Sequence, residues 1–352
     1  MCNVAMCDVP CVRQIRSPVQ DINELPLDEL FRVLQVNDSF TKLLAIAGEE
    51  DLGAGARPGD VTTQCCIEPR RWADGVMVAR EAGVLSGIAT LAQTMQVFGH
   101  ECQVSYRAQD GDRIRAGQTV AVLTGPMYQV LRAERTMLNL LGRMSGIATR
   151  TARFVEAIAG TGAQLLDTRK TTPGWRALEK FAVRCGGGHC HRVGLHDAVL
   201  FKENHIFGVP VRDLARWVMR AVEQARRTAD IQGDELRFVE LEVETLEQLE
   251  HVLAGGVCVP GQGVDIVLLD NMFPADLRQA VKMRAEHKSK VLFEASGGVT
   301  LETIRAIAGT GVERISVGGL THHAVSLDYS MDVQEAVKPE WMGEVDEDET
   351  DQ

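Results

Sequence analysis

Three short segments in the second half of the chain concentrate cationic side chains. They read DTRKTTPG, CGGGHCHRVG and VLFKENHI, and a fourth stretch, AERTMLNLLGRMSG, adds a further basic candidate. Arginine matches a carboxylate or a phosphate with a planar fork, and lysine offers a point charge. The segments therefore predict a site for a small ligand that carries several negative charges. The candidate residues are Arg135, Arg169, Lys170, His191, Arg192 and Lys202.

Two acidic residues, Glu242 and Asp270, end apolar runs farther along the chain. In a cationic cleft, such carboxylates suit Mg²⁺ that is held partly by ligand phosphates, or the hydroxyl groups of a sugar. Glu240 alternates with Glu242 and points to the same side of the expected strand. Glu242 lies nearer the carboxyl end of that strand, so it is the better candidate.

Glycine-rich turns follow the last two apolar runs, as Ser296-Gly297-Gly298 and Ser316-Val317-Gly318-Gly319. Because glycine has no side chain, such turns let backbone N–H groups approach a phosphate, helped by the N-terminus of the next helix. The two turns predict a phosphate-binding site, although glycine pairs also mark ordinary turns.

Six short apolar runs alternate with helical segments in the second half, which predicts parallel strands joined by right-handed crossovers. Polar or glycine-rich residues follow nearly every strand, and in a barrel all these strand ends meet on one face. A doubly wound sheet would gather function at one switch point instead, so we expect an α/β barrel. Six strands rather than eight indicate an incomplete one. The strands are expected at Gln164–Thr168, Ala198–Lys202, Arg237–Val243, Asp265–Asp270, Lys290–Ser296 and Glu313–Gly318, and helices at Val211–Arg227, Leu246–Ala254, Ala275–Ala285 and Leu301–Ala308.

The first half of the chain mixes helices and strands. Apolar residues at helical spacing predict helices over Leu27–Gly48, and the glycine- and aspartate-rich stretch Glu50–Thr63 is expected to be a loop. Strands are expected at Gly75–Leu85 and Gln103–Arg107. A long helical stretch, Leu131–Ala159, leads into the barrel half.

The formal net charge of the 352-residue chain is −12, and hydrophobic residues make up 45% of it. This composition is typical of a globular protein with a large core. A negative surface repels phosphate backbones, which argues against a general nucleic-acid binder. Seven acidic residues and no basic ones lie between Glu340 and Asp351, so this end is expected to be a solvated tail.

The chain contains nine cysteines, and no two of them are spaced as CxxC. Met1–Ile15 lacks the apolar core of a signal peptide, and no apolar run reaches the ~18 residues of a membrane span. These features predict a cytoplasmic protein with reduced thiols and no membrane partner. Neither Cys2, Cys7 and Cys11 nor the CGGGHCHR segment has zinc-site spacing, so no structural metal is expected.

Six motifs occur in an order and spacing that closely resemble the quinolinate phosphoribosyltransferase family. They are DTRKTTPG, GGGHCHRVGLHDAVLFKENHI, VELEVETLEQL, LLDNM, EASGGVT and ISVGGLTH, and the resemblance extends over roughly 27–333. It implies an α/β fold, with an N-terminal α/β sandwich domain and an incomplete, TIM-like α/β barrel. It also implies a homodimer in which the N-terminal domain of one subunit faces the barrel of the other. One residue departs from the pattern, since Cys190 stands where the family often has Asn.

The resemblance divides the chain into four parts. Residues 1–26 are expected to be an irregular extension, and residues 27–134 the sandwich domain. Residues 135–333 are expected to form the catalytic barrel, with the last of them returning to the N-terminal domain. Residues 334–352 are the acidic tail.

The resemblance also implies a reaction of de novo NAD biosynthesis. Quinolinate and phosphoribosyl pyrophosphate would give nicotinate mononucleotide, pyrophosphate and CO₂, with Mg²⁺ as cofactor. The glycine-rich turns would hold the 5′-phosphate, while Glu242 and Asp270 would face the ribose and Mg²⁺. Arg135, from the neighbouring subunit, would join Arg169, His191, Arg192 and Lys202 in a basic pocket, with Lys170 near the pyrophosphate or the carboxylates. The catalytic residues implied are Lys170, Lys202, Glu242 and Asp270.

Three other functions fit part of the pattern. A related phosphoribosyltransferase could use nicotinate, which has one carboxylate and releases no CO₂; five or six cationic groups favour two carboxylates plus phosphates. A barrel lyase or aldolase could use Lys170 or Lys202 as a Schiff base, which requires a lysine made nucleophilic by desolvation. A non-catalytic binder of phosphorylated metabolites would gain nothing from Glu242 and Asp270.

Overall fold

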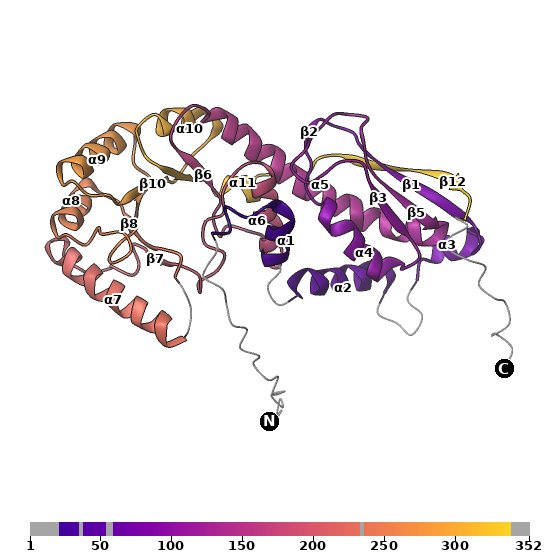
Figure 1. Cartoon of the computed structure of the whole chain (residues 1–352), viewed down its shortest axis with the longest axis horizontal. Helices are drawn as coiled ribbons and strands as arrows, with labels where there is room; N and C mark the ends of the chain where they lie inside the picture. The colour runs from indigo at the N-terminus through magenta and orange to yellow at the C-terminus, as the bar shows by residue number, and fades with distance from the viewer. Residues whose placement is uncertain (1–20, 35–37, 54–58, 233–235, 339–352) are drawn as a thin grey trace, which may run out of the picture.

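The computed structural model of the chain describes residues 21–34, 38–53, 59–232 and 236–338. Two lobes lie side by side, and the 31-residue helix α5 (Met127–Ala157) runs from one to the other (Figure 1). Cys2, Cys7 and Cys11, together with residues 339–352 of the expected acidic tail, lie outside the described residues.

The first lobe is built on antiparallel strands. They are β1 (Trp72–Ala79), β2 (Gly83–Val84), β3 (Gln103–Tyr106), β4 (Arg113–Ile114), β5 (Thr119–Pro126) and β12 (Tyr329–Ala336). The main sheet has the order β12-β1-β5-β3, and β2 pairs with β4 beside it. In this sheet β1 pairs with β5 along one edge and with β12 along the other. The last described strand therefore belongs to the sheet of the first lobe.

The helices of the first part are α1 (Leu27–Leu34), α2 (Ser39–Leu52), α3 (Val61–Cys66), the 3-10 turn η2 (Ile88–Thr90) and α4 (Leu91–Phe98). The prediction of a loop over Glu50–Thr63 is wrong at both ends, because α2 continues to Leu52 and α3 begins at Val61. Asp60 starts α3 as its N-cap, since its carboxylate accepts the N–H of Thr63 (3.0 Å). Aspartate in a glycine-rich stretch thus marked a helix start.

The second lobe contains six parallel strands in the order β6-β11-β10-β9-β8-β7. They are β6 (Gln164–Leu166), β7 (Val199–Phe201), β8 (Val239–Val243), β9 (Ile266–Asp270), β10 (Leu292–Ser296) and β11 (Arg314–Ser316). All six lie within the predicted ranges. Among the described residues β6 and β7 form the two edges and do not pair with each other, so the predicted incomplete barrel is confirmed.

Helices cover the outside of this strand ring (Figure 1). They are α6 (Arg176–Cys185), η3 (Val211–Asp213), α7 (Leu214–Gln232), α8 (Leu246–Ala254), α9 (Pro274–Glu286), α10 (Leu301–Ala308) and α11 (Gly319–His322). The bounds of α8 and α10 match the prediction, whereas α6 was not expected. Its arginines, lysine and glutamate give it a polar character in the sequence, but Leu178, Phe181 and Ala182 are buried.

The barrel strands are buried on both faces, and their alternation separates two environments. In β8, Val239, Leu241 and Val243 pack outward in one core with Leu249 and Val252 of α8. The residues between them point into the barrel, where the interior is polar: Glu240, Glu294 and, less buried, Arg314 lie there. An apolar shell thus surrounds a charged axis.

Helix α5 belongs to both lobes. Its first half, with Met137 and Leu141, packs in the core of the first lobe, and its second half, with Ile147 and Phe154, packs in the barrel core. The expected domain boundary between residues 134 and 135 falls inside this helix. The chain that returns to β12 crosses α5 at Gly146, where a Cβ would overlap the carbonyl oxygen of Val325.

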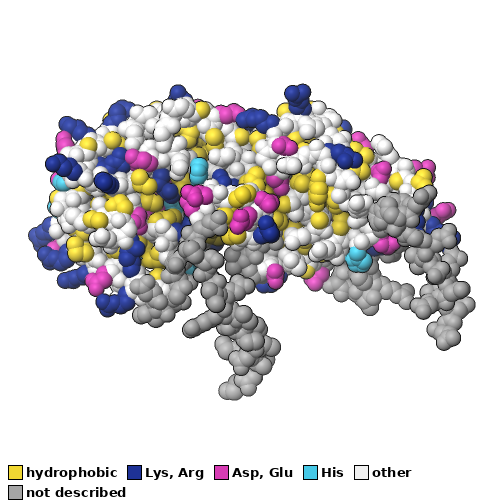
Figure 2. Space-filling view, in the orientation of Figure 1, with side chains coloured by type: hydrophobic (Ala, Val, Ile, Leu, Met, Phe, Trp, Pro, Cys, Tyr) yellow, Lys and Arg dark blue, Asp and Glu magenta, His cyan; other side chains and the backbone are white. Residues whose placement is uncertain are grey.

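The outer surface of the barrel lobe is not uniformly negative. Figure 2 shows Lys and Arg side chains gathered over α7, where Arg216, Arg220 and Arg227 are exposed. The six described cysteines are unpaired. Within the described ranges, no helix combines the length and the apolar composition needed to cross a membrane.

Candidate active site

A cavity of about 920 Å³ opens at the carboxyl ends of the barrel strands. The structure brings together there all the site residues predicted from the sequence except Arg135. These are Arg169, Lys170, His191, Arg192, Lys202, Glu242, Asp270, Ser296, Gly297, Gly298, Ser316, Gly318 and Gly319. Four different strands (β8, β9, β10 and β11) and five loops contribute, as expected of a barrel face.

Two arginines form the cationic side of the cavity. Arg169 follows β6, and Arg192 lies in the segment between α6 and β7. Neither has an ion pair among the described residues, and the Nε atom of Arg169 is buried without a hydrogen-bond partner. Burial lowers the pKa of Arg192, and the nearby charge of Arg169 lowers it further. Two adjacent guanidinium groups without a carboxylate constitute an anion site.

Contacts with β6 and α6 fix the position of the segment that carries Arg192. His189 forms a parallel bridge with Leu166, so the segment extends the edge of β6. Asp167 accepts hydrogen bonds from Nζ of Lys180 (2.6 Å) and from the backbone N–H of His191 (2.8 Å). Asp167 and Lys180 are fully buried, so this ion pair fixes the segment against α6. Neither residue was singled out in the sequence.

His191 lies at the inner wall of the cavity, in the polar interior of the barrel. Its Nε2 atom is 2.9 Å from Glu240 Oε2 and 3.3 Å from Glu294 Oε1. Burial lowers the pKa of His191, but the carboxylates of Glu294 and Glu240 more than offset this and raise it. The N–H of Arg192 donates to Nδ1 (2.8 Å), so the proton that the carboxylates hold is on Nε2. The prediction missed this engagement with two buried acids.

Lys202 and Glu242 form an ion pair in the wall of the cavity. The Nζ atom of Lys202 is paired with Oε2 of Glu242, which is almost fully buried. Burial raises the pKa of Glu242 to about 7, helped by Glu203 and Asp270 and opposed by Lys202. The electrostatic effect of Asp270 shows that the two predicted carboxylates lie close enough to repel each other.

The cavity is more acidic than the sequence suggested. Glu203, Glu244 and Glu294 line it in addition to the two predicted acids. Its cationic and anionic side chains are therefore nearly balanced in number. Arg169 and Arg192 have no ion pair among the described residues, whereas Lys202 is paired with Glu242 and His191 contacts two buried acids.

The two glycine-rich turns bring backbone close to other groups of the site. Gly297 has φ +95°, and a Cβ there would overlap Oδ1 of Asn271. A Cβ at Gly318 would lie 2.8 Å from Cδ of Lys170. The hydroxyl of Thr321 donates to the carbonyl oxygen of Lys170 (2.6 Å), which ties the turn after β11 to the loop after β6. Glycine is required at Gly297, where φ is positive, whereas at Gly318 a side chain would displace the end of Lys170.

Three further cationic or titratable residues line the cavity and were missed. Arg150, on α5, donates from Nε to the carbonyl oxygen of Gly319 (2.7 Å). His322 and His323 follow the last glycine turn, with ring centroids 4.1 Å apart. The histidine pair is visible in the sequence directly after that turn. No sequence signal marks Arg150, because it approaches the barrel mouth from a helix shared with the other lobe.

Arg135 lies on α5 outside the cavity of its own chain. Its side chain is two-thirds exposed, and its guanidinium is 3.7 Å from the carboxylate of its neighbour Glu134. Cys190 likewise does not line this cavity, since its thiol is buried on the other side of the segment that carries His191. The departure from the frequent Asn at this position thus leaves the cavity wall intact.

Comparison with known proteins identifies the fold and the family. Models of the quinolinate phosphoribosyl transferase N-terminal and C-terminal domains match residues 60–145 and 147–332. The chain belongs to the quinolinate phosphoribosyltransferase family. A nicotinate-nucleotide pyrophosphorylase (carboxylating) of Mycobacterium leprae is 41% identical over 298 residues, which are 84% of this chain and 98% of that protein. A probable enzyme of the same name from Bacillus subtilis is 38% identical over 284 residues, 81% of this chain and 90% of that protein.

The solved structures agree with the sequence match. A nicotinate-nucleotide pyrophosphorylase from Francisella tularensis superposes with a TM-score of 0.74 at 34% identity, and covers 90% of this chain and all of that one. The predicted resemblance to the quinolinate phosphoribosyltransferase family is therefore confirmed for fold and family.

Proposed function

We propose that this quinolinate phosphoribosyltransferase family member transfers the phosphoribosyl group of phosphoribosyl pyrophosphate to quinolinate, with loss of CO₂. The product would be nicotinate mononucleotide, a precursor of NAD. The observation that carries the proposal is the pair of unpaired guanidinium groups, Arg169 and Arg192, in one cavity with Glu242 and Asp270. A dicarboxylate fits the first pair, and the ribose with its phosphates fits the second.

Binding follows from the division of charge in the cavity. Arg169 and Arg192 hold the two carboxylates of quinolinate, with Lys170 at the exposed edge. The turns after β10 and β11 offer backbone N–H groups to the 5′-phosphate. In this proposal the pyridine ring lies between the two arginines and the carboxylates of Glu242 and Asp270.

The transfer step needs no nucleophilic side chain. The pyridine nitrogen donates its electron pair to the anomeric carbon of the ribose, and the bond from that carbon to the pyrophosphate oxygen breaks. Positive charge develops on the ribose as in glycoside cleavage, and the carboxylates of Glu242 and Asp270 stabilise it. Lys170 and Lys202 neutralise the charge of the departing pyrophosphate.

Decarboxylation follows the transfer. Once alkylated, the ring nitrogen is cationic, so the bond to the adjacent carboxylate can break and leave its electron pair on the ring carbon. CO₂ departs, and a proton from solvent replaces it. The cationic nitrogen stabilises the carbanion, and Arg169 and Arg192 hold the ring through its remaining carboxylate.

We propose that Mg²⁺ is the cofactor. The carboxylates of Glu242 and Asp270 repel each other, and a hard cation with oxygen ligands would relieve this repulsion. These two residues would hold the ion together with phosphate oxygens of the substrate, and the ion would supply charge neutralisation at the leaving pyrophosphate.

We also propose that the enzyme is a cytoplasmic homodimer in which Arg135 of one subunit completes the cavity of the other. Support comes from the exposure of Arg135 and from its position outside the cavity of its own chain. The unpaired thiols of the described cysteines agree with a reducing compartment.

The structure weakens the Schiff-base alternative. The Nζ atom of Lys202 is held in an ion pair with Glu242, so it is not free to attack a carbonyl carbon. For the nicotinate alternative, a single carboxylate would leave one of the two guanidinium groups without a partner. A non-catalytic binder has no use for the carboxylate pair.

A direct assay tests the proposal. Purified protein is mixed with phosphoribosyl pyrophosphate, Mg²⁺ and either quinolinate or nicotinate, and both mononucleotide formation and CO₂ release are measured. We expect stoichiometric mononucleotide and CO₂ from quinolinate only. Turnover of nicotinate without CO₂ would instead favour the one-carboxylate enzyme.

Ionisation of Glu242 should make kcat/KM fall on the acidic side of its pH profile, which we call the acidic limb. Its pKa is raised to about 7, so the carboxylate forms as the pH rises through 7 and is lost as the pH falls. We expect kcat/KM for phosphoribosyl pyrophosphate to rise between pH 6 and pH 8. Glu242→Gln should lower kcat/KM on the order of 10²-fold and remove this limb, because the amide cannot ionise.

The control for this experiment is Glu247→Gln, an equivalent change at an exposed position of α8. It should leave both the rate and the pH profile unchanged. Substrate phosphates also titrate in this range, so the profile of Glu242→Gln reports their share. An unchanged acidic limb in Glu242→Gln would exclude Glu242 as its origin.

A further inference from the structure

A second cavity, of about 870 Å³, lies at the opposite ends of the barrel strands. We call it the lower cavity; its wall includes Arg226, Arg237, Phe238, Lys290, Leu292 and Arg314. Phe238 directly precedes β8, while Leu292 and Arg314 are the first residues of β10 and β11. The proposed reaction uses none of these residues.

The lower cavity has an excess of cationic groups over acidic ones. Four basic side chains line it, against Asp21 and Asp265. Arg237 pairs with Asp197 (3.3 Å) and Asp21 (3.5 Å), and Arg226 pairs with Asp265 (3.5 Å). Lys290 has no ion pair among the described residues. Arg314 pairs with Glu294 (2.8 Å), so each of the three arginines has an acidic partner and Lys290 supplies the positive charge that is not offset.

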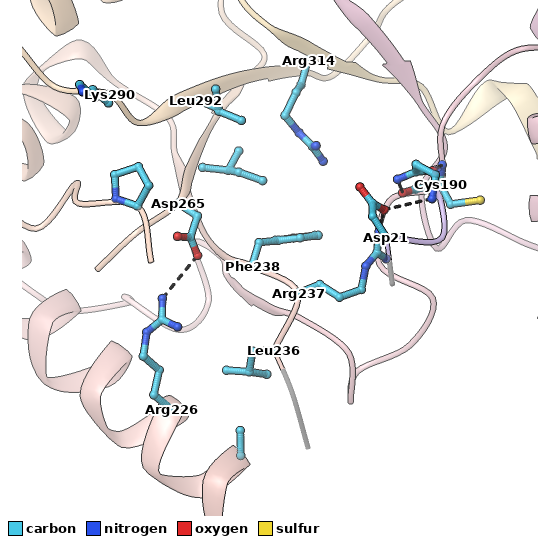
Figure 3. Close-up of a pocket in the computed structure, with 14 residues that line it drawn as sticks. Asp21, Cys190, Arg226, Leu236, Arg237, Phe238, Asp265, Lys290, Leu292 and Arg314 are labelled. Carbon is cyan, nitrogen blue, oxygen red and sulfur yellow. Dashed lines mark hydrogen bonds and ion pairs between the residues drawn. The ribbon is translucent and has the colours of Figure 1, made fainter. Parts of the chain in front are cut away.

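Arg314 provides a second feature of an anion site. Its Nε atom donates to Glu294 (2.8 Å), but its Nη2 atom is buried without a hydrogen-bond partner. A buried guanidinium nitrogen without a partner is unfavourable unless a ligand or water supplies one. Figure 3 shows the Arg314 side chain pointing into the cavity.

The remaining wall is apolar and includes an aromatic ring. Phe238 lies between Arg237 and Arg314, whose guanidinium carbons are 5.8 Å and 5.6 Å from the ring centroid (Figure 3). Leu292 stands beside them and is 40% exposed. A flat apolar group can pack against Phe238 and Leu292 while its anionic group reaches Arg314.

A thin partition separates the lower cavity from the catalytic one. Cys190 lies in the wall of the lower cavity, and the next residue, His191, lines the catalytic cavity. Arg314 is bonded to Glu294, whose other oxygen lies 3.3 Å from His191 Nε2. Arg237 donates to the carbonyl oxygen of His191 (3.3 Å). Arg237 and Arg314 of the lower cavity are therefore linked to His191 in the wall of the catalytic cavity, Arg237 directly and Arg314 through Glu294.

We propose that the lower cavity binds a small aromatic anion, a carboxylate or phosphate ester, and that this ligand weakens quinolinate binding. The anion draws Arg314 away from Glu294. The carboxylate of Glu294 then lies closer to Nε2 of His191. Because His191 is part of the wall of the catalytic cavity, the affinity of that cavity for quinolinate falls. The binding of the anion stands by itself, whereas the coupling rests on the proposed function.

Phenyl phosphate serves as the probe, and isothermal titration measures its binding without turnover. We expect one site in the lower cavity with Kd on the order of 10⁻⁴ M, as for a small ligand with one charged group. Leu292→Trp should fill the cavity and abolish this binding, while leaving turnover unchanged. Lys290→Glu, an exposed substitution that cannot disturb the core, should raise Kd about fivefold.

Two controls locate the binding. Lys282→Glu reverses an exposed charge on α9 outside the cavity and should leave Kd unchanged. Arg169→Ala alters the catalytic cavity and should retain the lower site. Absence of binding to the wild-type protein, or binding that is lost in Arg169→Ala and kept in Leu292→Trp, would overturn the proposal.

The coupling is measured separately. In the wild-type protein phenyl phosphate should raise Kd for quinolinate about fivefold, and quinolinate should raise Kd for phenyl phosphate by the same factor. Leu292→Trp should abolish the effect. Binding without this coupling would overturn the second half of the proposal, and a protein that binds phenyl phosphate but does not turn over quinolinate would refute the proposed function alone.

Discussion

Arg169→Ala is expected to reduce kcat/KM for quinolinate on the order of 10²- to 10³-fold. Among the described residues the Arg169 guanidinium has no hydrogen bond or ion pair, and it lies beside Arg192, so it can bind a ligand carboxylate. Each charge-assisted hydrogen bond in such a site contributes roughly 1.5–3 kcal/mol, and every 1.4 kcal/mol is about tenfold. The measurement is steady-state kinetics with quinolinate varied.

The same substitution should not destabilise the fold. Arg169 has no ion pair among the described residues, and its removal relieves repulsion with Arg192. We expect Tm to stay within about 2 °C of the wild-type value, since no side-chain hydrogen bond of Arg169 among the described residues is lost. Arg169→Lys should recover only part of the activity because it keeps the charge but not the planar fork.

Arg278→Ala is the matched control for Arg169→Ala, because Arg278 is exposed on α9 and does not line the catalytic cavity. It should have wild-type kinetics. Full activity of Arg169→Ala with quinolinate would remove Arg169 from the substrate site, and with it the main support for the proposed substrate.

Mixed dimers of two inactive variants should regain about a quarter of the wild-type activity. Arg135→Ala and Lys202→Ala are each expected to lose turnover on the order of 10²-fold. If Arg135 acts in the cavity of the partner, a dimer of one subunit of each kind contains one intact site and one doubly defective site. Random pairing makes about half of all dimers mixed, which gives the expected fraction.

The control is a mixture of Arg169→Ala and Lys202→Ala. Both residues line the cavity of their own chain, so every site in a mixed dimer keeps one defect and no activity should return. Failure of the first mixture to recover, with mixed dimers demonstrated by mass, would contradict the assignment of Arg135 to the neighbouring subunit.

The site residues at the strand ends could be predicted because their position depends only on where each strand ends in the sequence. In a parallel barrel, residues at or just beyond the carboxyl end of a strand lie on the catalytic face, so Arg169, Glu242 and Asp270 were identified without a structure. The same reasoning located the two glycine turns. It depended on strand spacing, which the apolar runs show clearly.

Pairing inside the barrel could not be predicted. His191 contacts Glu240 of β8 and Glu294 of β10. Both strands pair with β9, and no local sequence pattern predicts the register of that pairing. Arg150 enters the site from α5, and its contact with Gly319 joins residues far apart in the chain. Helix α6 was missed because its buried face is short and mixed with charged residues.

The place of β12 has a consequence for how the protein is made. Strand β1 is paired on both sides only when β12 is present, and β12 is synthesised after the whole barrel. During translation one edge of β1 therefore presents unpaired N–H and C=O groups to other nascent chains. We infer that the first lobe completes its fold last, although its residues leave the ribosome first.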